Sequence, residues 1–205
     1  MKGYPNDLYI LAFDHRGTLT KGLLGVEGRQ PSDEEVARVS SMKDIIFDGF
    51  LEASSKGIEG GDPAILVDET FGLQVQNRAK EMGIKLAAPV EKSGQKIFDF
   101  EYGDDFGEKI KEVNADFVKI LVRWNPDDDS ETRQIQGERI KTLSDWLDEN
   151  ERKFLLEFLV PASEEQLASV DGDQARYDSE IRPKLAVKVV EEMRERGADP
   201  DIWKI

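Results

Sequence analysis

The chain has 205 residues, 35% of them charged, and its acidic residues outnumber the basic ones to give a net charge of −15. Such a surface repels phosphate backbones and anionic headgroups, which argues against nucleic acids and membrane surfaces as partners. The absence of cysteine excludes disulfides, thiolate metal ligands and cysteine nucleophiles. The first residues, M-K-G-Y-P-N-D, lack the apolar core of a signal peptide, and no apolar run is long enough to span a membrane, so we expect a cytoplasmic protein.

Apolar runs alternate with amphipathic stretches along the chain. Strands are expected at 8–13, 64–67, 84–90, 117–124 and 154–160 and from 201 onward. Helices are expected at 33–56, 72–82, 104–113, 131–150 and 179–196. The segment D-H-R-G-T after the first strand is expected to be a polar turn. Most of the expected strands are continuous apolar runs, which is typical of parallel strands covered on both faces.

Strands separated by helices imply right-handed parallel crossovers and an α/β fold. Two architectures share this pattern, the doubly wound sheet and the (β/α)8 barrel. The polar residues that follow strand ends, among them Asp14, Asp68, Glu91 and Arg123, favour the barrel, because barrel enzymes gather their chemistry there. D-H-R-G-T is also no Gly-rich phosphate loop. We therefore expect a single TIM-barrel type domain over 1–205, with about six of the eight β/α units in the order 1-2-3-4-5-6.

A closed barrel of this type has eight strands, whereas the sixth expected strand opens at Asp201. The chain is therefore expected to be an incomplete barrel: a truncated gene product, half of a split protein, or a fragment that closes by association. A homo-oligomer, or another chain that supplies the missing strands, is the expected protein partner.

Three apolar strands carry one ionisable residue each: Lys119 in F-V-K-I-L-V-R-W, Glu157 in F-L-L-E-F-L-V-P and Lys204 in D-I-W-K-I. A charge in such a run is costly to bury unless it is paired or neutralised. Because side chains alternate along a strand, Lys119 and Glu157 are expected to face the same interior and to pair. A lysine held beside another cation in an apolar pocket is suited to Schiff-base formation with a carbonyl. The alternatives are a buried structural ion pair and, for Lys204, an exposed lysine near a chain end.

Asp14 and Arg16 share a face with Ala12, so both are expected to reach the barrel mouth. The alternative for these two residues is a local Asp–Arg pair in a turn. His15, the only histidine, points the other way by alternation and is expected to be structural.

Arg16, Glu91, Lys92 and Arg123 lie at expected strand ends and are candidate substrate-binding residues. The acidic run 127–129 has no E-x-x-H motif or second histidine to support a metal site, so a solvated loop or helix start is expected. The D-G-D segment 171–173 lacks the other ligands of a calcium loop and is expected to be a turn. No metal and no cofactor are expected.

Several of these segments match a known family. L-A-F-D-H-R-G, V-K-I-L-V, L-L-E and D-I-W-K-I resemble the strands of class I aldolases of the tagatose-1,6-bisphosphate aldolase group. Over essentially the whole chain, A-P-V-E-K-S-G, I-L-V-R-W-N-P and R-P-K-L resemble more closely the aldolase-like domain fused to 5-dehydro-2-deoxygluconokinase in inositol catabolism. The resemblance implies a (β/α)8 barrel with Lys204 as the Schiff-base lysine. It also implies that Glu157 is a proton shuttle, Lys119 a second lysine of the site and Asp14 its strand-one aspartate.

The first functional hypothesis is a class I aldolase, an aldehyde-lyase that cleaves a phosphorylated ketose or keto-acid sugar through a lysine Schiff base. The resemblance implies a substrate such as tagatose 1,6-bisphosphate or 5-dehydro-2-deoxygluconate 6-phosphate. In such barrels, loops after the last two strands hold the phosphate, and this sequence contains neither strand. The second hypothesis is a non-catalytic barrel fragment that senses sugar phosphates or binds a partner. A metal-dependent aldolase is the third, and the single histidine argues against it.

Overall fold

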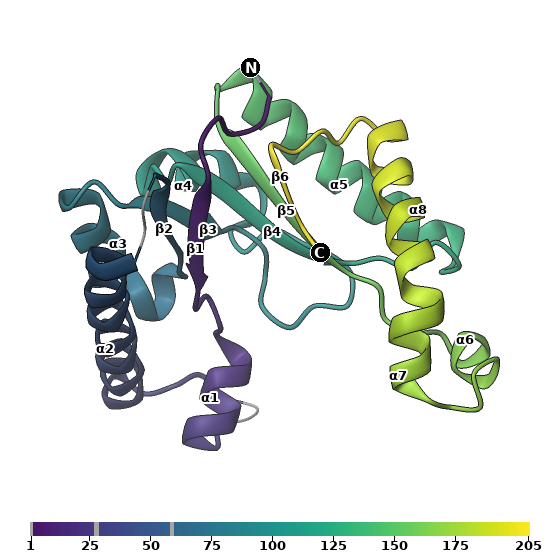
Figure 1. Ribbon diagram of the computed structural model, residues 1–205, viewed down its shortest axis with the longest axis horizontal. Helices are drawn as coiled ribbons and strands as arrows, with labels where there is room; N and C mark the ends of the chain where they lie inside the picture. Colours follow the sequence, from purple (N-terminus) through teal and green to yellow (C-terminus); the bar gives the residue numbers. More distant parts are fainter. Residues whose placement is uncertain (1, 27–28, 58–59) are drawn as a thin grey trace.

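The computed structural model describes residues 2–26, 29–57 and 60–205. Its centre is one parallel sheet in the order β1-β2-β3-β4-β5-β6, as the sequence predicts. The sheet curls into an arc, with helices along its outer side and β1 and β6 at its two edges (Figure 1). The predicted α/β fold of TIM-barrel type is thus confirmed, as part of a barrel. The strands are β1 Leu8–Ala12, β2 Asp62–Leu66, β3 Lys85–Pro89, β4 Phe117–Arg123, β5 Lys153–Leu159 and β6 Ile202–Lys204.

The helices differ from the prediction at α1, at the starts of α3 and α8, and between β5 and α8, where α6 Glu164–Ala168 and α7 Gln174–Arg176 form in a stretch with no expected helix. Helix α1 includes the end of the expected polar turn, and α3 begins before residue 72 because the side chain of Asp68 accepts a hydrogen bond from Phe71 N and caps it. The expected helix at 179–196 opens with a π-helical turn at Tyr177–Ile181, and Pro183 occupies the first turn of α8. The helices are α1 Gly17–Leu24, α2 Asp33–Gly57, α3 Glu69–Glu81, α4 Phe106–Val113, α5 Ser130–Glu149, α6 Glu164–Ala168, α7 Gln174–Arg176 and α8 Arg182–Glu195, with a 3-10 turn at Gly103–Asp105.

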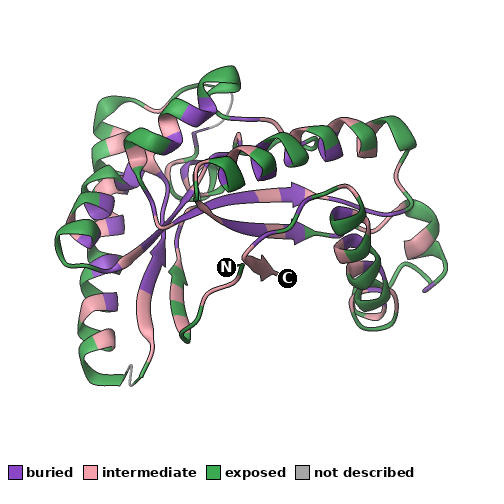
Figure 2. Ribbon diagram, turned by 90° about the horizontal axis from the view of Figure 1, so that it is seen from above, coloured by how far each residue is buried: buried purple, intermediate pink, exposed green. Residues whose placement is uncertain are grey.

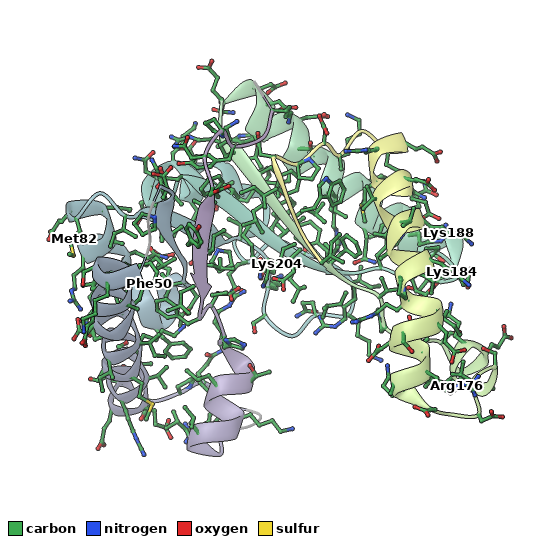
Figure 3. The ribbon with its side chains drawn as sticks, viewed as in Figure 1. Phe50, Met82, Arg176, Lys184, Lys188 and Lys204 are labelled. Carbon is green, nitrogen blue, oxygen red and sulfur yellow. The ribbon has the colours of Figure 1, made fainter. Side chains whose placement is uncertain are left out.

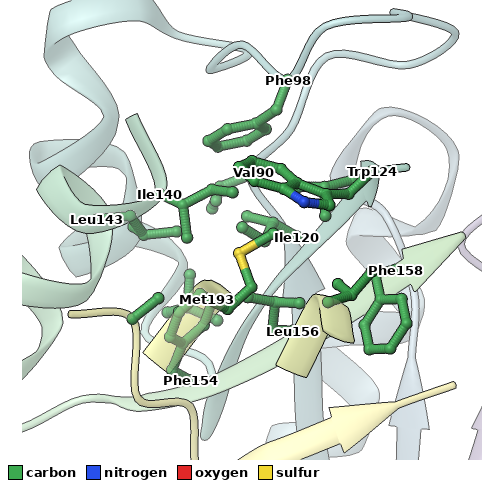
Figure 4. Packing of buried hydrophobic residues seen from close by; sticks show 14 of the residues in the cluster. Val90, Phe98, Ile120, Trp124, Ile140, Leu143, Phe154, Leu156, Phe158 and Met193 are labelled. Carbon is green, nitrogen blue, oxygen red and sulfur yellow. The ribbon is translucent and has the colours of Figure 1, made fainter. Parts of the chain in front are cut away.

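Side chains on the strands alternate between the outer and inner faces of the arc. The outward residues of β4 and β5, such as Ile120 and Leu156, join a large apolar cluster that packs the sheet against α5 and α8 (Figure 4). Within the described part of the chain, the inner face has a smaller apolar cluster, which includes Phe117 and Leu155. The next inward residue on each of these two strands is charged, so polar groups lie beside this apolar cluster, nearer the carboxyl ends of the strands.

The N-terminal segment crosses the arc at the amino-terminal ends of the strands. Gly3 N donates a hydrogen bond to Asp201 Oδ1 at 2.9 Å, and Lys153 Nζ donates to the Gly3 carbonyl at 2.9 Å. Tyr4 packs edge-on against Phe117, with ring centroids 5.3 Å apart. The segment links β1 to the starts of β5 and β6 at this end of the arc, and Figure 2 shows the N-terminus beside β6.

A substitution at Gly107 tests the packing between α4 and α5. A Cβ at this glycine would lie 2.7 Å from Nε1 of Trp146. Gly107→Ala is therefore expected to lower the free energy of unfolding by ~1–3 kcal/mol, because the indole must move. Gly49→Ala in α2 is the matched control, since its Cβ meets no atom within 4 Å, and stability should rise by about 0.5–1 kcal/mol. Urea denaturation measures both effects; a rise in stability for Gly107→Ala would contradict the packing.

Candidate active site

An open cleft of about 630 Å³ lies at the carboxyl ends of the strands, a volume within the usual range for small-molecule sites of about 300–1,000 Å³. The side chains that line it come from the ends of β1, β3, β4, β5 and β6, so segments far apart in the sequence meet here. The lining includes all the site residues that the sequence singles out: Asp14, Arg16, Glu91, Lys92, Lys119, Arg123, Glu157 and Lys204.

Lys119 lies at the centre of the site, with only 2% of its side chain exposed. Its Nζ is 2.8 Å from Asp14 Oδ2, 3.0 Å from Glu91 Oε1 and 3.2 Å from Glu157 Oε2. Burial alone would lower the pKa of Lys119, but the three carboxylates outweigh burial and raise it. Lys119 therefore remains a cation at neutral pH and holds together carboxylates from three separate segments.

Glu157 connects the two lysines. Its Oε1 accepts a hydrogen bond from Lys204 Nζ at 2.5 Å, while its Oε2 faces Lys119. The contact with Lys204 follows from the register, because these two residues are direct partners in the pairing of β5 with β6. The side chain of Lys204 is 40% exposed and lies inside the arc (Figure 3). Of the two lysines, Lys204 is thus the one that a molecule in the cleft can reach.

Glu91 and Arg16 form a second layer beside Lys119. Glu91 is buried, and its Oε1 is shared between Lys119 and Nη2 of Arg16, which lies 3.3 Å away. Arg16 also donates to the Glu91 carbonyl at 2.8 Å and pairs with Glu101. Burial raises the pKa of Glu91 against the pull of these cations, and its Oε2 has no hydrogen-bond partner among the described residues. The side chain of Glu91 is thus bound by Lys119 and Arg16.

Lys92 and Arg123 lie at the rim of the cleft and bind the loop that follows β3. Lys92 Nζ is 3.0 Å from Asp99 Oδ2, and Arg123 Nη1 donates to the Gln95 carbonyl at 2.9 Å. An antiparallel bridge between Glu91 and Phe100 closes this loop. The two cations therefore border the cleft while they fix the shape of its edge.

The predicted orientation of His15 is wrong, and one polar residue that follows a strand end, Asp68, lies away from the cleft. His15 is exposed and lines the cleft, although alternation places it on the opposite side. The reason is that β1 ends at Ala12, so the alternation of a strand no longer holds at residue 15. Asp68 does not line the cleft; it is 1% exposed and pairs with Lys43 of α2, a residue that the sequence analysis missed.

The two acidic segments, 127–129 and 171–173, lie at the starts of helices. Asp129 caps α5 by accepting a hydrogen bond from Thr132 N at 2.7 Å, and Asp173 caps α7 by accepting from Ala175 N at 2.9 Å. Within 2–26, 29–57 and 60–205, no three acidic or histidine side chains are grouped as a metal ion would need. None of the helices in these ranges combines the length and apolarity of a membrane span.

Asp14 gives the site a predicted pH dependence. Burial opposes its ionisation, but the Lys119 ammonium outweighs burial and lowers the pKa of Asp14. Such a carboxyl stabilises the fold above its unfolded pKa and loses that contribution as the pH falls through its folded pKa. Asp14→Asn is therefore expected to be less stable than the wild type at neutral pH, with a difference that shrinks in acid.

Urea denaturation at a series of pH values measures this difference. Because Lys119 supplies the stabilisation, the effect of Asp14→Asn should largely disappear in a Lys119→Met background. A difference between wild type and Asp14→Asn that stays constant with pH would contradict the assignment.

Comparison with known proteins matches nearly the whole chain. The chain is 24% identical over 201 residues to tagatose 1,6-diphosphate aldolase of Lactococcus lactis subsp. lactis. The aligned region covers 95% of this chain and 56% of the relative. Proteins of the same name from Streptococcus pneumoniae serotype 4 (strain ATCC BAA-334 / TIGR4) and, numbered 2, from Streptococcus agalactiae serotype III (strain NEM316) are 24% and 22% identical over 200 residues, with the same coverage. The chain thus spans little more than half the length of these curated relatives.

These relatives confirm the predicted resemblance to the tagatose-bisphosphate aldolase group. A family model described as "Uncharacterized protein conserved in bacteria (DUF2090)" matches residues 2–205. That range includes the whole arc of strands and every residue that lines the cleft. The chain therefore belongs to this bacterial family, DUF2090.

Proposed function

We propose that the protein is a class I aldolase for a phosphorylated sugar, with Lys204 as the amine that forms a Schiff base. The main support is the row of contacts Lys204–Glu157–Lys119 in the cleft. It combines an accessible amine, a carboxylate 2.5 Å from it, and a buried ammonium 3.2 Å from the same carboxylate. The names of the relatives also support an aldolase reaction.

In the proposed reaction, Glu157 accepts a proton from Lys204, and the free amine attacks the ketone carbon of the substrate. The resulting carbinolamine takes up a proton on its oxygen and loses water, which leaves an iminium ion. Glu157, which has given its proton to the carbinolamine oxygen, takes the proton of the substrate hydroxyl on the carbon that becomes the aldehyde. The iminium ion accepts the electron pair of the breaking C–C bond, so the aldehyde departs and an enamine remains. Protonation of the enamine and addition of water to the imine then release the ketone product and restore Lys204.

The neighbours of Glu157 have separate roles in this proposal. Lys119 stays charged, so it holds Glu157 in place and balances its negative charge when the carboxylate is free of a proton. Asp14, on the other side of Lys119, orients this ammonium and can accept a hydrogen bond from a substrate hydroxyl.

The rim of the cleft supports a phosphorylated substrate. Arg16, Lys92 and Arg123 border the opening, although the chain as a whole has a net charge of −15. Positive charge at this opening attracts an anion, and guanidinium groups suit phosphate oxygens. We propose tagatose 1,6-bisphosphate as the substrate, and 5-dehydro-2-deoxygluconate 6-phosphate of inositol catabolism as the second candidate. Dihydroxyacetone phosphate is the ketone product expected from either sugar.

Borohydride trapping with dihydroxyacetone phosphate tests the proposal. The ketone should form an iminium ion with Lys204, which borohydride reduces to a stable secondary amine. Mass mapping should locate the modification on the peptide that contains Lys204. Glycerol 3-phosphate, which has no carbonyl group, is the matched control and should leave no modification. If neither the ketone nor the two sugar phosphates leave an adduct, the Schiff-base proposal is rejected and a binding role is favoured.

A further inference from the structure

A buried ion pair lies directly behind the turn that carries Asp14. Lys43 of α2 and Asp68, which follows β2, are each 1% exposed, and the ammonium is in contact with Asp68 Oδ1. Apolar residues of α2, α3 and the outer sheet face, including Phe47 and Phe71, pack in the same region. The pair is not in the cleft and has no part in the reaction proposed above.

The ammonium of Lys43 also binds the backbone on both sides of Asp14. It donates to the carbonyl of Phe13 at 2.8 Å and to the carbonyl of His15 at 3.2 Å. With Asp68, these oxygens use all three donors of a lysine ammonium. The residue between the two carbonyls is the one whose carboxylate contacts Lys119.

Asp68 connects this ammonium to the rest of the scaffold. One carboxylate oxygen binds Lys43, while the other accepts a hydrogen bond from Phe71 N at 2.9 Å and caps α3. The end of β1 is in turn bonded to β2, because Phe13 N donates to the Leu66 carbonyl at 2.9 Å. Lys43 thus joins α2, the start of α3 and the turn after β1 at one point.

Stability alone does not explain a buried charge at this place. Burial lowers the pKa of Lys43 even though Asp68 opposes the shift. A well-packed apolar group is often as stabilising as a buried ion pair, or more so. An apolar side chain could not bind two carbonyls, however, so what the lysine adds is a fixed backbone position at 13–15.

We propose that Lys43, paired with Asp68, is a positioning residue that fixes the turn at 13–15 and thereby sets Asp14 against Lys119 and Arg16 against Glu91. The importance of this position for catalysis rests on the function proposed above. The geometric claim does not, because the contact between Asp14 and Lys119 can be measured without substrate.

The test removes both charges of the pair and keeps the helix cap. In the double variant Lys43→Met, Asp68→Asn, the asparagine oxygen can still cap α3, and loss of both opposite charges leaves little net change in the field at Asp14. Carbon NMR titration, with the Asp14 signal assigned from Asp14→Asn, reads out the contact with Lys119. We expect the pKa of Asp14 to rise towards its ordinary value of about 3.9 as the turn loosens.

The second readout is the rate of borohydride trapping with dihydroxyacetone phosphate. A displacement of about 1 Å at a reacting group can reduce a rate by ~10²-fold, and we expect a loss of up to this size in the double variant. If the pair acts through Asp14, the loss should be much smaller when Asp14→Asn is already present. Leu185→Ala in α8 is the control, since Leu185 belongs to an apolar cluster that contains no residue of the turn; it should lower stability but change neither readout.

Each outcome decides the proposal. A folded double variant with an unchanged pKa of Asp14 and an unchanged trapping rate would show that the pair only stabilises the fold. Should that variant not fold, Lys43→Gln, Asp68→Asn also removes both charges but retains a donor for one carbonyl, and it is expected to shift the pKa of Asp14 in the same direction; an unchanged value there overturns the proposal too. Absence of trapping in the wild type would reject the aldolase function, while the titration of Asp14 would still test the positioning role.

Discussion

Replacing Lys204 by alanine is expected to abolish the borohydride-trapped adduct completely. The proposed reaction needs a primary amine at this point of the cleft, and Lys204 is the lysine that contacts Glu157 while 40% of its side chain is exposed. Lys119 cannot take over, because it is 2% exposed and three carboxylates hold it as a cation. Only a neutral amine attacks a carbonyl, so the loss should be total rather than partial.

Lys204→Arg should give the same result by a different route. Arginine keeps the positive charge and can still pair with Glu157, but its guanidinium stays protonated and forms no imine. Lys188→Ala, on the outer surface of α8 (Figure 3), is the matched control and should trap substrate as well as the wild type. Trapped product in Lys204→Ala, mapped to another lysine, would show that Lys204 is not the nucleophile.

The order of the strands and the position of most elements could be predicted from the sequence, because continuous apolar runs separated by amphipathic helices leave few topologies. The pattern does not predict helix α1, G-T-L-T-K-G-L-L, because its two glycines and two threonines have low helix propensity. The break before α8 was also missed. Whether such segments become helical depends on contacts that form only in the folded chain.

The meeting of Lys119, Glu157 and Lys204 could be inferred because it depends on two regular features. Side chains alternate along each strand, and parallel neighbours put Glu157 beside Lys204. His15 shows where this reasoning ends: it lies past the end of β1, and a turn has no fixed period that the sequence reveals.

The sequence pattern contains a signal for Lys43 but does not by itself identify it as a buried cation. It stands four residues after Val39 and four before Phe47, and all three are buried on one face of α2. The apolar residues Ile45 and Ile46 of the same helix are exposed instead, at 70% and 41%. A lysine inside an apolar i, i+4 series marks a buried cation only if a partner such as Asp68 is known, and that partner comes from another element.

Glu157→Gln is expected to slow turnover by ~10²–10⁴-fold while the adduct with Lys204 still forms, because proton transfer by a positioned side chain typically contributes that much. Glutamine has nearly the same shape and keeps an oxygen towards Lys204, but it cannot accept a proton from the amine or return one to the carbinolamine. Lys119 keeps Asp14 and Glu91 as partners, so the variant should remain folded. The measurement pairs steady-state cleavage with the yield of trapped adduct at long incubation, and Glu112→Gln, an exposed residue of α4, serves as the unaffected control. If the adduct is lost together with turnover, Glu157 mainly positions Lys204. If turnover is unchanged, the proton-transfer role belongs to Asp14 or Glu91, the other carboxylates that contact Lys119.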